Sequence, residues 1–295
     1  MQNFINTLFE TLTERFDGEV KRSTVQKANT KELIGFTFIK KGNEIGANPT
    51  LYPEGYYEKY VAGVDIEDIA DDMLAIVEKS SGKNLGFEVD SLTNWEFVKG
   101  KVRPMVVSKE NNAEYLSNMA YTDTKTDLAI IYSIVLSSDD SGMANVKITK
   151  QMLEAYGITM TELKKAAFKN SESLYEFKNI MDELMKLMGI ESEEMAISMG
   201  LERSPMWVLS TEDKTNGAGM MFVPKVMKAI KERLGIEQFY ILPSSIHEVL
   251  VVNTSEATPS ELRNMVREVN ATQVAPEERL SDNVYFYDGK KLSVA

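Results

Sequence analysis

Apolar residues recur along the chain at two spacings, one typical of helices and one typical of strands. Near the amino terminus, four apolar residues stand four apart and predict a helix: Phe4, Leu8, Leu12 and Phe16. Residues 65–81 carry the clearest helical pattern, and Asp65 is placed to cap that helix. Its apolar face is predicted to consist of Ile66, Ile69, Ala70, Met73, Leu74 and Val77.

Two further helix starts are marked by capping-box patterns, Thr159 with Glu162 and Thr258 with Glu261. Residues 224–235 begin with proline and end with glycine, which is the arrangement that helix ends favour. Between the helix that starts at Thr159 and the helix of residues 224–235, the spacing predicts a methionine-rich helix. It contains Leu174, Phe177, Met181, Leu184 and Met188.

Turn residues between apolar runs predict strands that pair as hairpins. Residues 19–41 predict one hairpin with its turn at 29–31, and residues 126–148 predict a second with its turn at 137–142.

Three more strand pairs are expected towards the carboxyl terminus. Residues 205–223 predict a hairpin with Asn216–Gly217 at its bend. Residues 240–242 and 248–252 predict two strands, and the proline and serines of residues 243–246 form their short connection. The last two strands are predicted from the segments NVYFY and KLSV.

Hairpins interspersed with helices favour antiparallel sheets, because parallel strands need a crossover. The sequence therefore predicts an α+β fold with antiparallel sheets and helices packed on one face. We expect an N-terminal α+β region, residues 1–122, and a C-terminal α+β region, residues 123–295. The order from residue 205 reads ββαββαββ, which predicts one antiparallel sheet with helices 224–234 and 259–272 on the same face.

The composition narrows the classes of function. The chain has 295 residues, no cysteine and a net charge of −12, so disulfides and thiolate chemistry are excluded. Its first residues show no signal-peptide pattern, and the apolar run at 128–136 is far shorter than the ~20 residues that span a bilayer. A surface this acidic repels phosphate backbones and acidic membranes. We expect a cytoplasmic protein that binds neither nucleic acid nor membranes.

The only histidine, His247, lies among polar residues that suggest chemistry, with Ser245 and Glu248 beside it and Glu277 further along the chain. These residues are the candidates for catalysis, as a hydrolase or a metal-dependent enzyme. The competing interpretation is structural, because residues two apart on a strand seldom form a serine–histidine pair and no nucleophile-elbow motif is present. We favour the structural interpretation and expect neither a metal nor a cofactor.

Two groups of side chains suggest binding instead of catalysis. Tyr56, Tyr57 and Tyr60 lie on one predicted helix, where they either pack on a sheet or line a pocket. Five methionines fall within residues 181–199, next to acidic residues that indicate exposure. Flexible thioethers suit surfaces that adapt to protein partners, and they also fill ordinary cores.

Three segments resemble a bacterial family known as a domain of unknown function numbered fifty-six eighty-eight: PTLYPEGYYEKY, LPSSIHEVLVV and REVNATQVAPEERLSDNVYFYD. The resemblance covers nearly the whole chain. It implies a setting in gut anaerobes, often beside genes of mobile elements, and no established activity. The motifs of that family map onto Tyr56, Tyr57, His247, Glu248, Asn270, Thr272, Gln273 and Glu277.

Three functions remain open from the sequence. The first is a protein-interaction or regulatory module of a mobile element, favoured by the acidic composition, the methionine-rich segment and the lack of catalytic motifs. The second is a hydrolase or metal-dependent enzyme that uses His247 and nearby carboxylates. The third is a small-molecule-binding protein with a tyrosine-lined pocket, and Asn270, Thr272 and Gln273 are further candidates for contact with a ligand or partner.

Overall fold

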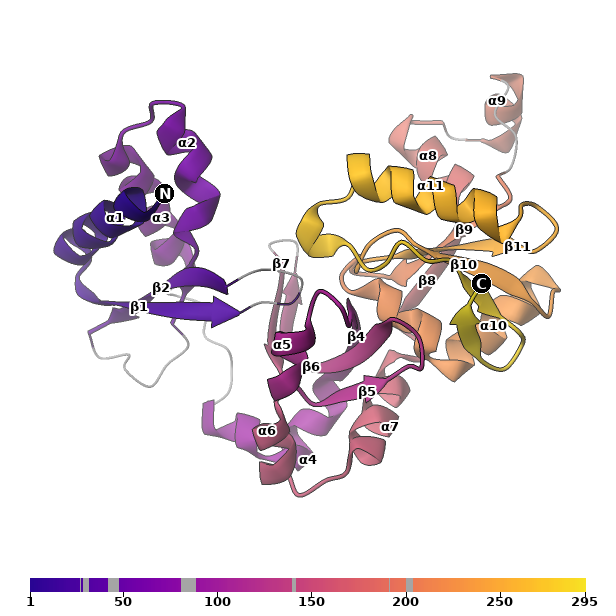
Figure 1. Ribbon diagram of the computed structural model, residues 1–295, viewed down its shortest axis with the longest axis horizontal. Coiled ribbons are helices and arrows are strands. Elements are labelled where there is room, and N and C mark those ends of the chain that lie inside the picture. Colours follow the sequence, from indigo (N-terminus) through magenta and orange to yellow (C-terminus); the bar gives the residue numbers. More distant parts are fainter. Residues whose placement is uncertain are drawn as a thin grey trace. The chain divides into compact units, whose positions relative to one another are not determined.

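The computed structural model describes residues 1–26, 28, 32–41, 48–80, 89–139, 142–190, 192–199 and 204–295. The chain forms two compact units, Met1–Leu92 and Thr93–Ala295 (Figure 1). The predicted turn at 29–31 and the centre of the turn at 137–142 lie outside the described residues.

The first unit is a three-stranded antiparallel sheet with helices on one face. The sheet order is β1 (Gly18–Gln26), β2 (Glu32–Lys40) and β3 (Thr50–Leu51). The helical elements are α1 (Gln2–Arg15), η1 (Pro53–Tyr56), α2 (Tyr57–Val61) and α3 (Ile66–Ser80). The core joins α1, α3 and the sheet through Phe4, Ile5, Leu8, Leu12, Val20, Phe36, Phe38, Ile69, Ala70, Met73 and Val77.

The local signals read for this unit are confirmed. The Asp65 carboxylate accepts a hydrogen bond of 3.3 Å from the backbone N–H of Glu67, so it caps α3. The predicted apolar face of α3 packs into the core, with Ile66 and Leu74 at its edge. The hairpin is also confirmed, because Gly18 pairs with Lys40 and the register continues along both strands.

The second unit begins with a four-stranded antiparallel sheet. Its strands are β4 (Val102–Ser108), β5 (Tyr121–Asp123), β6 (Leu128–Asp139) and β7 (Gly142–Lys147), and β6 pairs with the other three. The boundary between the two units falls within η2 (Val89–Thr93). The helical elements that follow in the second unit are α4 (Trp95–Val98), η3 (Lys99–Lys101), α5 (Ala113–Asn118), α6 (Lys150–Ala155) and α7 (Met160–Ser171). Because β4 pairs with β6 along its whole length, residues 93–122 belong with the second unit, and the division differs from the expected one at 122–123.

A six-stranded antiparallel sheet completes the second unit, in the order β13-β12-β10-β11-β9-β8. Its strands are β8 (Tyr175–Asn179), β9 (Met206–Thr211), β10 (Phe239–Pro243), β11 (Val249–Asn253), β12 (Tyr285–Tyr287) and β13 (Leu292–Val294). The helical elements are α8 (Ile180–Leu187), α9 (Glu193–Ser198), η4 (Gly217–Phe222), α10 (Pro224–Leu234), α11 (Pro259–Thr272) and η5 (Pro276–Glu278). The α+β class with antiparallel sheets is confirmed, and so is a single sheet for the strands after residue 205.

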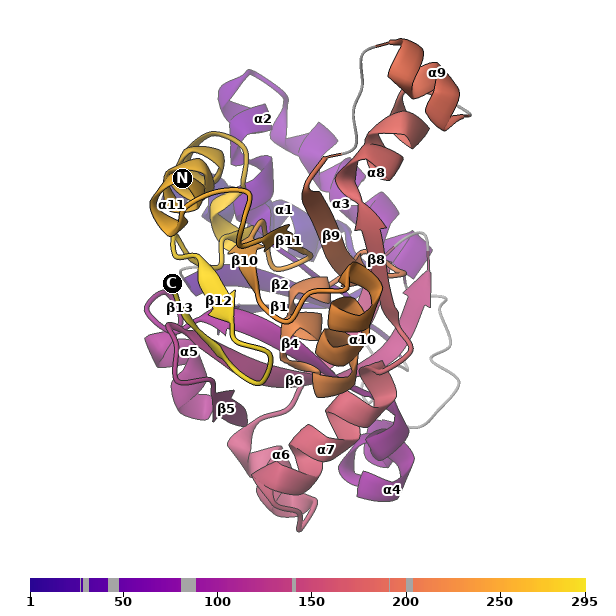
Figure 2. The same ribbon diagram turned by 90° about the vertical axis from the view of Figure 1, so that its right-hand side faces the viewer.

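Helices α10 and α11 lie on opposite faces of this sheet, so the expectation that they share a face is wrong (Figures 1 and 2). Val266 of α11 packs with Val252, whereas Arg233 of α10 lies 5.2 Å from the ring of Trp207. Trp207 pairs with Val251, which places it on the face opposite Val252. Strands β10 and β11 are apolar on both sides, and such strands are buried on both faces.

Two predicted elements have a different structure. Residues 175–179 form strand β8, so the methionine-rich helix begins only at Ile180. The hairpin predicted for 205–223 is wrong, because only β9 is a strand and residues 217–222 form the helical turn η4. Asn216 adopts a left-handed conformation with φ of 56° that leads into η4.

Candidate functional site

The connection between β10 and β11 carries His247. The two strands pair antiparallel with Pro243 opposite Val249, as expected from the sequence of this segment. The connection is held by two backbone hydrogen bonds to other segments, from Ile246 N–H to the Glu278 carbonyl oxygen at 2.9 Å and from Ala218 N–H to the Ile246 carbonyl oxygen at 3.3 Å. Three parts of the chain therefore meet at His247: this connection, the start of η4, and η5.

The imidazole of His247 joins the same three segments. Its Nδ1 accepts a hydrogen bond of 3.2 Å from the backbone N–H of Asn216. Its Nε2 lies 3.5 Å from Oε1 of Glu278. Because Nδ1 is an acceptor, the neutral ring carries its proton on Nε2, which points to the carboxylate. The carboxylate that faces the ring belongs to Glu278, the neighbour of the predicted Glu277.

The serines beside His247 bind backbone and carboxylate groups. Ser245 Oγ accepts a hydrogen bond of 3.0 Å from the His247 N–H, and Ser244 Oγ donates one of 3.2 Å to Oε1 of Glu248. Ser210 Oγ donates a hydrogen bond of 2.8 Å to the His247 carbonyl oxygen. In none of these three contacts does a serine hydroxyl meet the imidazole; the hydroxyls bind backbone and carboxylate groups that hold the junction together.

Gly217 permits the close approach at this junction. A Cβ atom at residue 217 would lie 2.5 Å from the His247 carbonyl oxygen and 2.6 Å from Cα and Oγ of Ser210. Only a residue without a side chain fits in this position.

A small cavity lies beside the junction, lined in part by Arg103, Ser133 and Asn216. Its volume of ≈ 10 Å³ is room for about one water molecule, far less than a substrate needs. Arg103 donates a hydrogen bond of 2.8 Å to the nearby Asp213 carboxylate. Burial acts to raise the pKa of Asp213, but hydrogen bonds from Thr211 and Arg103 outweigh it and hold that pKa below its ordinary value.

A polar network that the sequence did not indicate is centred on Asp127. Its carboxylate accepts hydrogen bonds from Ser281 Oγ, from Asn283 Nδ2 at 3.1 Å and from the Tyr285 hydroxyl at 2.8 Å. Tyr285 is fully buried. Burial, and then the negative charge of Asp127, raise the pKa of Tyr285, so its hydroxyl stays protonated and serves as a donor.

The remaining candidates from the carboxyl-terminal motif have different environments. Asn270 is buried and donates to the Ser281 carbonyl oxygen at 3.0 Å and to Oδ1 of Asp282 at 2.8 Å, so it supports the segment that reaches Asp127. Thr272 is exposed, and its hydroxyl donates to the Glu268 carbonyl oxygen at 2.8 Å. Exposed Gln273 ends α11, and exposed Glu277 lies in η5.

The tyrosines of the first unit pack against α1. The ring centroid of Phe4 lies 5.6 Å from that of Tyr57 and 4.8 Å from that of Tyr60. Tyr56 lies under the ammonium of Lys59, which is 5.5 Å from the ring centroid. These rings extend the hydrophobic core to the surface. The first unit also contains a pocket, and the three tyrosines are not among the residues that line it.

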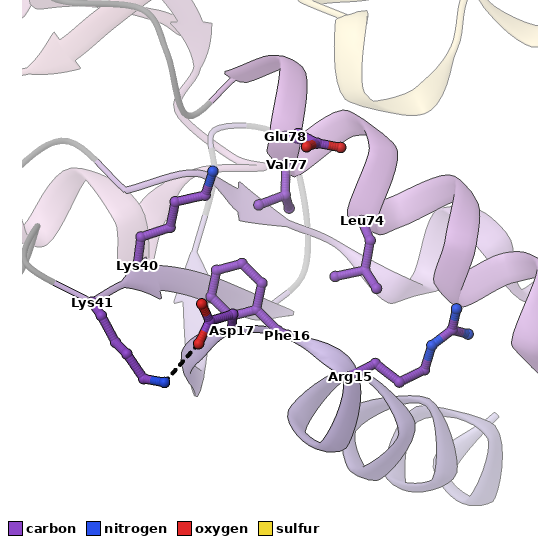
Figure 3. A pocket seen from close by; sticks show the side chains of 8 residues that line it. All are labelled: Arg15, Phe16, Asp17, Lys40, Lys41, Leu74, Val77 and Glu78. Carbon is purple, nitrogen blue, oxygen red and sulfur yellow. Dashed lines mark hydrogen bonds and ion pairs between the residues drawn. The ribbon is translucent and has the colours of Figure 1, made fainter.

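That pocket has a volume of ≈ 360 Å³ and lies where α1 ends, β2 ends and α3 passes (Figure 3). Its apolar wall consists of Phe16, Leu74 and Val77, and its charged residues are Arg15, Asp17, Lys40, Lys41 and Glu78. Volumes of this size are typical of small-molecule sites. No local pattern in the sequence indicates this pocket, because its residues come from three separate segments.

Helices α8 and α9 form an arm that extends away from the six-stranded sheet (Figures 1 and 2). We define the arm by the described residues of 180–199. Ile190 and Ala196 are its buried residues. Its exposed apolar side chains are Leu184, Leu187, Met188, Met195, Ile197 and Met199. The structure thus gathers three of the five methionines of residues 181–199 on an exposed surface.

The described part of the chain has neither a cluster of metal-ligating side chains nor a helix of membrane-spanning type. No three histidine, aspartate or glutamate side chains gather there as a potential metal site. None of the helices in the described ranges has the length and apolar composition needed to cross a bilayer.

Comparison with known protein families gives a match over nearly the whole chain. The model of a family described as "Family of unknown function (DUF5688)" matches residues 1–289, nearly the whole chain. This match confirms the family to which the sequence motifs pointed. No curated protein matches the chain, and no solved structure matches it.

Proposed function

We propose that this chain, which belongs to the family of unknown function DUF5688, is a protein-binding module whose docking surface is the arm. The observation that carries the proposal is the exposure of large apolar side chains on both α8 and α9, which reaches 84% for Leu187 and 64% for Ile197. Exposed apolar patches bordered by polar residues are typical of protein interaction sites.

Charge favours one class of partner. Residues 180–199 contain five acidic residues and one lysine, Lys186, in a chain whose net charge is −12. An apolar surface with an acidic border complements a helix with an apolar face and a basic polar face. The partner segment we propose is therefore a basic amphipathic helix.

The methionines of the arm suit such a partner. Met188, Met195 and Met199 are each about half exposed. Thioether side chains have many rotamers and a polarizable sulfur, so they adapt to apolar partners of different shape. We propose that this binding serves a regulatory role in a mobile element, the setting that the family resemblance implies.

Binding of synthetic helical peptides to the full chain tests the proposal. Three labelled peptides share one apolar face and carry lysine, serine or glutamate on the polar face, and fluorescence anisotropy gives each Kd. We expect the lysine peptide to bind most tightly, with an affinity that falls as salt rises. Replacing Leu187, Met188 and Ile197 with serine should weaken this binding at least tenfold, which corresponds to about 1.4 kcal/mol.

A matched control uses exposed apolar residues of another helix in the same unit. Met265 and Val269 of α11 are 40% and 37% exposed, and replacing both with serine should leave the Kd unchanged. Equal binding of the three peptides, or equal loss of binding in the arm and α11 variants, would contradict a specific docking surface. If the lysine peptide binds most tightly and the arm variant weakens it, crosslinking from residue 187 in the native host can identify the natural partner.

A further inference from the structure

We propose that the pocket of the first unit binds an apolar α-amino acid as its zwitterion. This inference is independent of the arm, because every residue that lines the pocket lies within Met1–Leu92. It rests on the combination of an apolar wall with two side chains of opposite charge that make no hydrogen bond or ion pair with a residue that the structure describes.

The apolar wall is fixed by packing with the core. The ring of Phe16 meets that of Phe38 edge-on, with 5.3 Å between the centroids and 84° between the planes. Val77 is buried, and Leu74 is partly buried one helical turn earlier on α3. Figure 3 shows Phe16, Leu74 and Val77 bordering the same space. This wall offers an apolar side chain both an aromatic ring and methyl groups to pack on.

Most charges around the pocket already have partners. Arg15 binds the Glu67 carboxylate at 2.8 Å and also binds Asp71. Lys41 binds Asp17 at 2.6 Å, and this hydrogen bond holds the pKa of Asp17 below its ordinary value. These contacts reduce the attraction of the three groups for a ligand.

Lys40 and Glu78 differ from the other charged residues of the wall. Neither side chain makes a hydrogen bond or an ion pair with another residue that the structure describes. Figure 3 shows Lys40 at the end of β2 and Glu78 on α3, both at the rim next to Val77. The rim therefore presents one ammonium and one carboxylate above an apolar wall.

A zwitterion complements this rim better than a single charge does. The carboxylate of an amino acid can pair with Lys40 and its ammonium with Glu78, while its side chain lies against Phe16. A ligand that carries only a carboxylate leaves Glu78 without a partner and is repelled by it. A ligand that carries only an ammonium leaves Lys40 without a partner and is repelled by it.

The test is a titration of the full chain with three related ligands. L-Phenylalanine carries both charges, 3-phenylpropanoate carries only the carboxylate, and phenethylamine carries only the ammonium. Methyl NMR of leucine and valine residues reports binding through the signals of Leu74 and Val77. We expect saturable shifts of these two signals, with the tightest binding for phenylalanine.

Variants assign the two charges. Lys40→Gln should weaken binding of phenylalanine about two- to fivefold, the range for exposed ion pairs, and leave phenethylamine unaffected or tighter. Glu78→Gln should weaken binding of phenylalanine by a similar factor and leave 3-phenylpropanoate unaffected or tighter. Lys79→Gln is the matched control, because Lys79 is exposed on α3 and does not line the pocket.

Three results would overturn the proposal. One is the absence of saturable shifts at Leu74 and Val77 with phenylalanine at millimolar concentration. Another is tighter binding of 3-phenylpropanoate than of phenylalanine, which would make the pocket a site for simple carboxylates. The third is binding of phenylalanine that Lys40→Gln and Glu78→Gln change no more than Lys79→Gln does.

Discussion

The side-chain amide of Asn179 donates a hydrogen bond of 2.8 Å to the carbonyl oxygen of Ser204, so the residue that precedes the arm is joined to the segment that leads into β9. The same side chain caps α8, because its Oδ1 accepts a hydrogen bond of 3.1 Å from the Met181 N–H. Asn179 is buried. One residue therefore fixes both where the arm leaves β8 and where it returns to β9.

Asn179→Ala is expected to destabilise the second unit and loosen the arm. Loss of a helix cap costs ~0.5–2 kcal/mol, and the partly buried Ser204 carbonyl left without its donor adds up to ~1 kcal/mol. Urea denaturation measures the total, and hydrogen exchange should show faster exchange throughout 180–187. Ser192→Ala is the control, because Ser192 caps only α9 and is exposed. Equal exchange rates in α8 for both variants would contradict the role of Asn179.

Gly217→Ala should destabilise the junction around His247. The new Cβ would stand 2.5 Å from the His247 carbonyl oxygen, so backbone must move and the hydrogen bond from Ser210 is strained. We expect a loss of ~2 kcal/mol or more, as for other overpacked core sites. Gly100→Ala is the matched control, because a Cβ there meets nothing within 4 Å. Thermal unfolding of both variants tests this expectation. Equal melting temperatures would contradict the close approach of residue 217 to the His247 carbonyl oxygen.

Local signals predicted helix starts well, because a cap acts over two or three residues. Thr159–Glu162 and Thr258–Glu261 form complete capping boxes, and Asp65 caps α3. The Asn216–Gly217 pair shows the limit of such signals. Asn216 does adopt a left-handed conformation, but it leads into η4 and does not form a hairpin bend. The close approach of Gly217 to His247, thirty residues later in the sequence, could not be predicted from the local pattern.

Long-range contacts explain why the sites could not be predicted. Ser281 and Asp127 are 154 residues apart, and nothing near either residue indicates their hydrogen bond. The opposite placement of α10 and α11 was missed for a related reason. The order of strands and helices is compatible with helices on one face of the sheet or on both. Only the apolar character of both faces of β10 and β11 indicates that helices cover both faces. His247 stood out because it is the only histidine, which says nothing of its contacts.

Asp127→Ala should cost ~2–4 kcal/mol of unfolding free energy, because it leaves the Tyr285 hydroxyl and the Ser281 and Asn283 donors without their acceptor. Asp127→Asn keeps one oxygen and should cost less. A double-mutant cycle with Tyr285→Phe isolates the contact between Asp127 and Tyr285. Urea denaturation gives the unfolding free energy of each protein in the cycle. We expect the double variant to be more stable than the sum of the single losses implies, and strict additivity would show that the two groups do not interact.

His247→Ala should lower the unfolding free energy by ~1 kcal/mol or somewhat more, since the Asn216 N–H loses its acceptor. His247→Gln should restore part of this loss, because the glutamine amide can replace one hydrogen bond. The geometry favours His247→Asn, because the oxygen of asparagine occupies the δ position that accepts from Asn216. Urea denaturation ranks the three variants. If asparagine is no better than alanine while the fold is intact, the bond to Nδ1 contributes nothing.

Lys147 gives the second unit a pH-dependent stability. Its ammonium donates a hydrogen bond of 2.7 Å to Asn145 Oδ1, and burial lowers its pKa from 10.5 to about 8. Between these two pH values the unfolded chain holds a proton that the folded chain has lost. The contribution of Lys147 to stability therefore rises as the pH increases through this window, and below pH 8 the cost of burying the charge is present in full.

Lys147→Met removes that cost. We expect the variant to be more stable than the parent at pH 7 by an amount on the order of 2 kcal/mol, and the difference to shrink between pH 8 and pH 10.5. Urea denaturation of both proteins across this range gives the difference directly, so other groups that titrate there cancel. Lys228→Met, at an exposed position of α10, should show no such change with pH. A difference that stays constant from pH 7 to pH 10.5 would mean that Lys147 keeps an ordinary pKa in the folded protein.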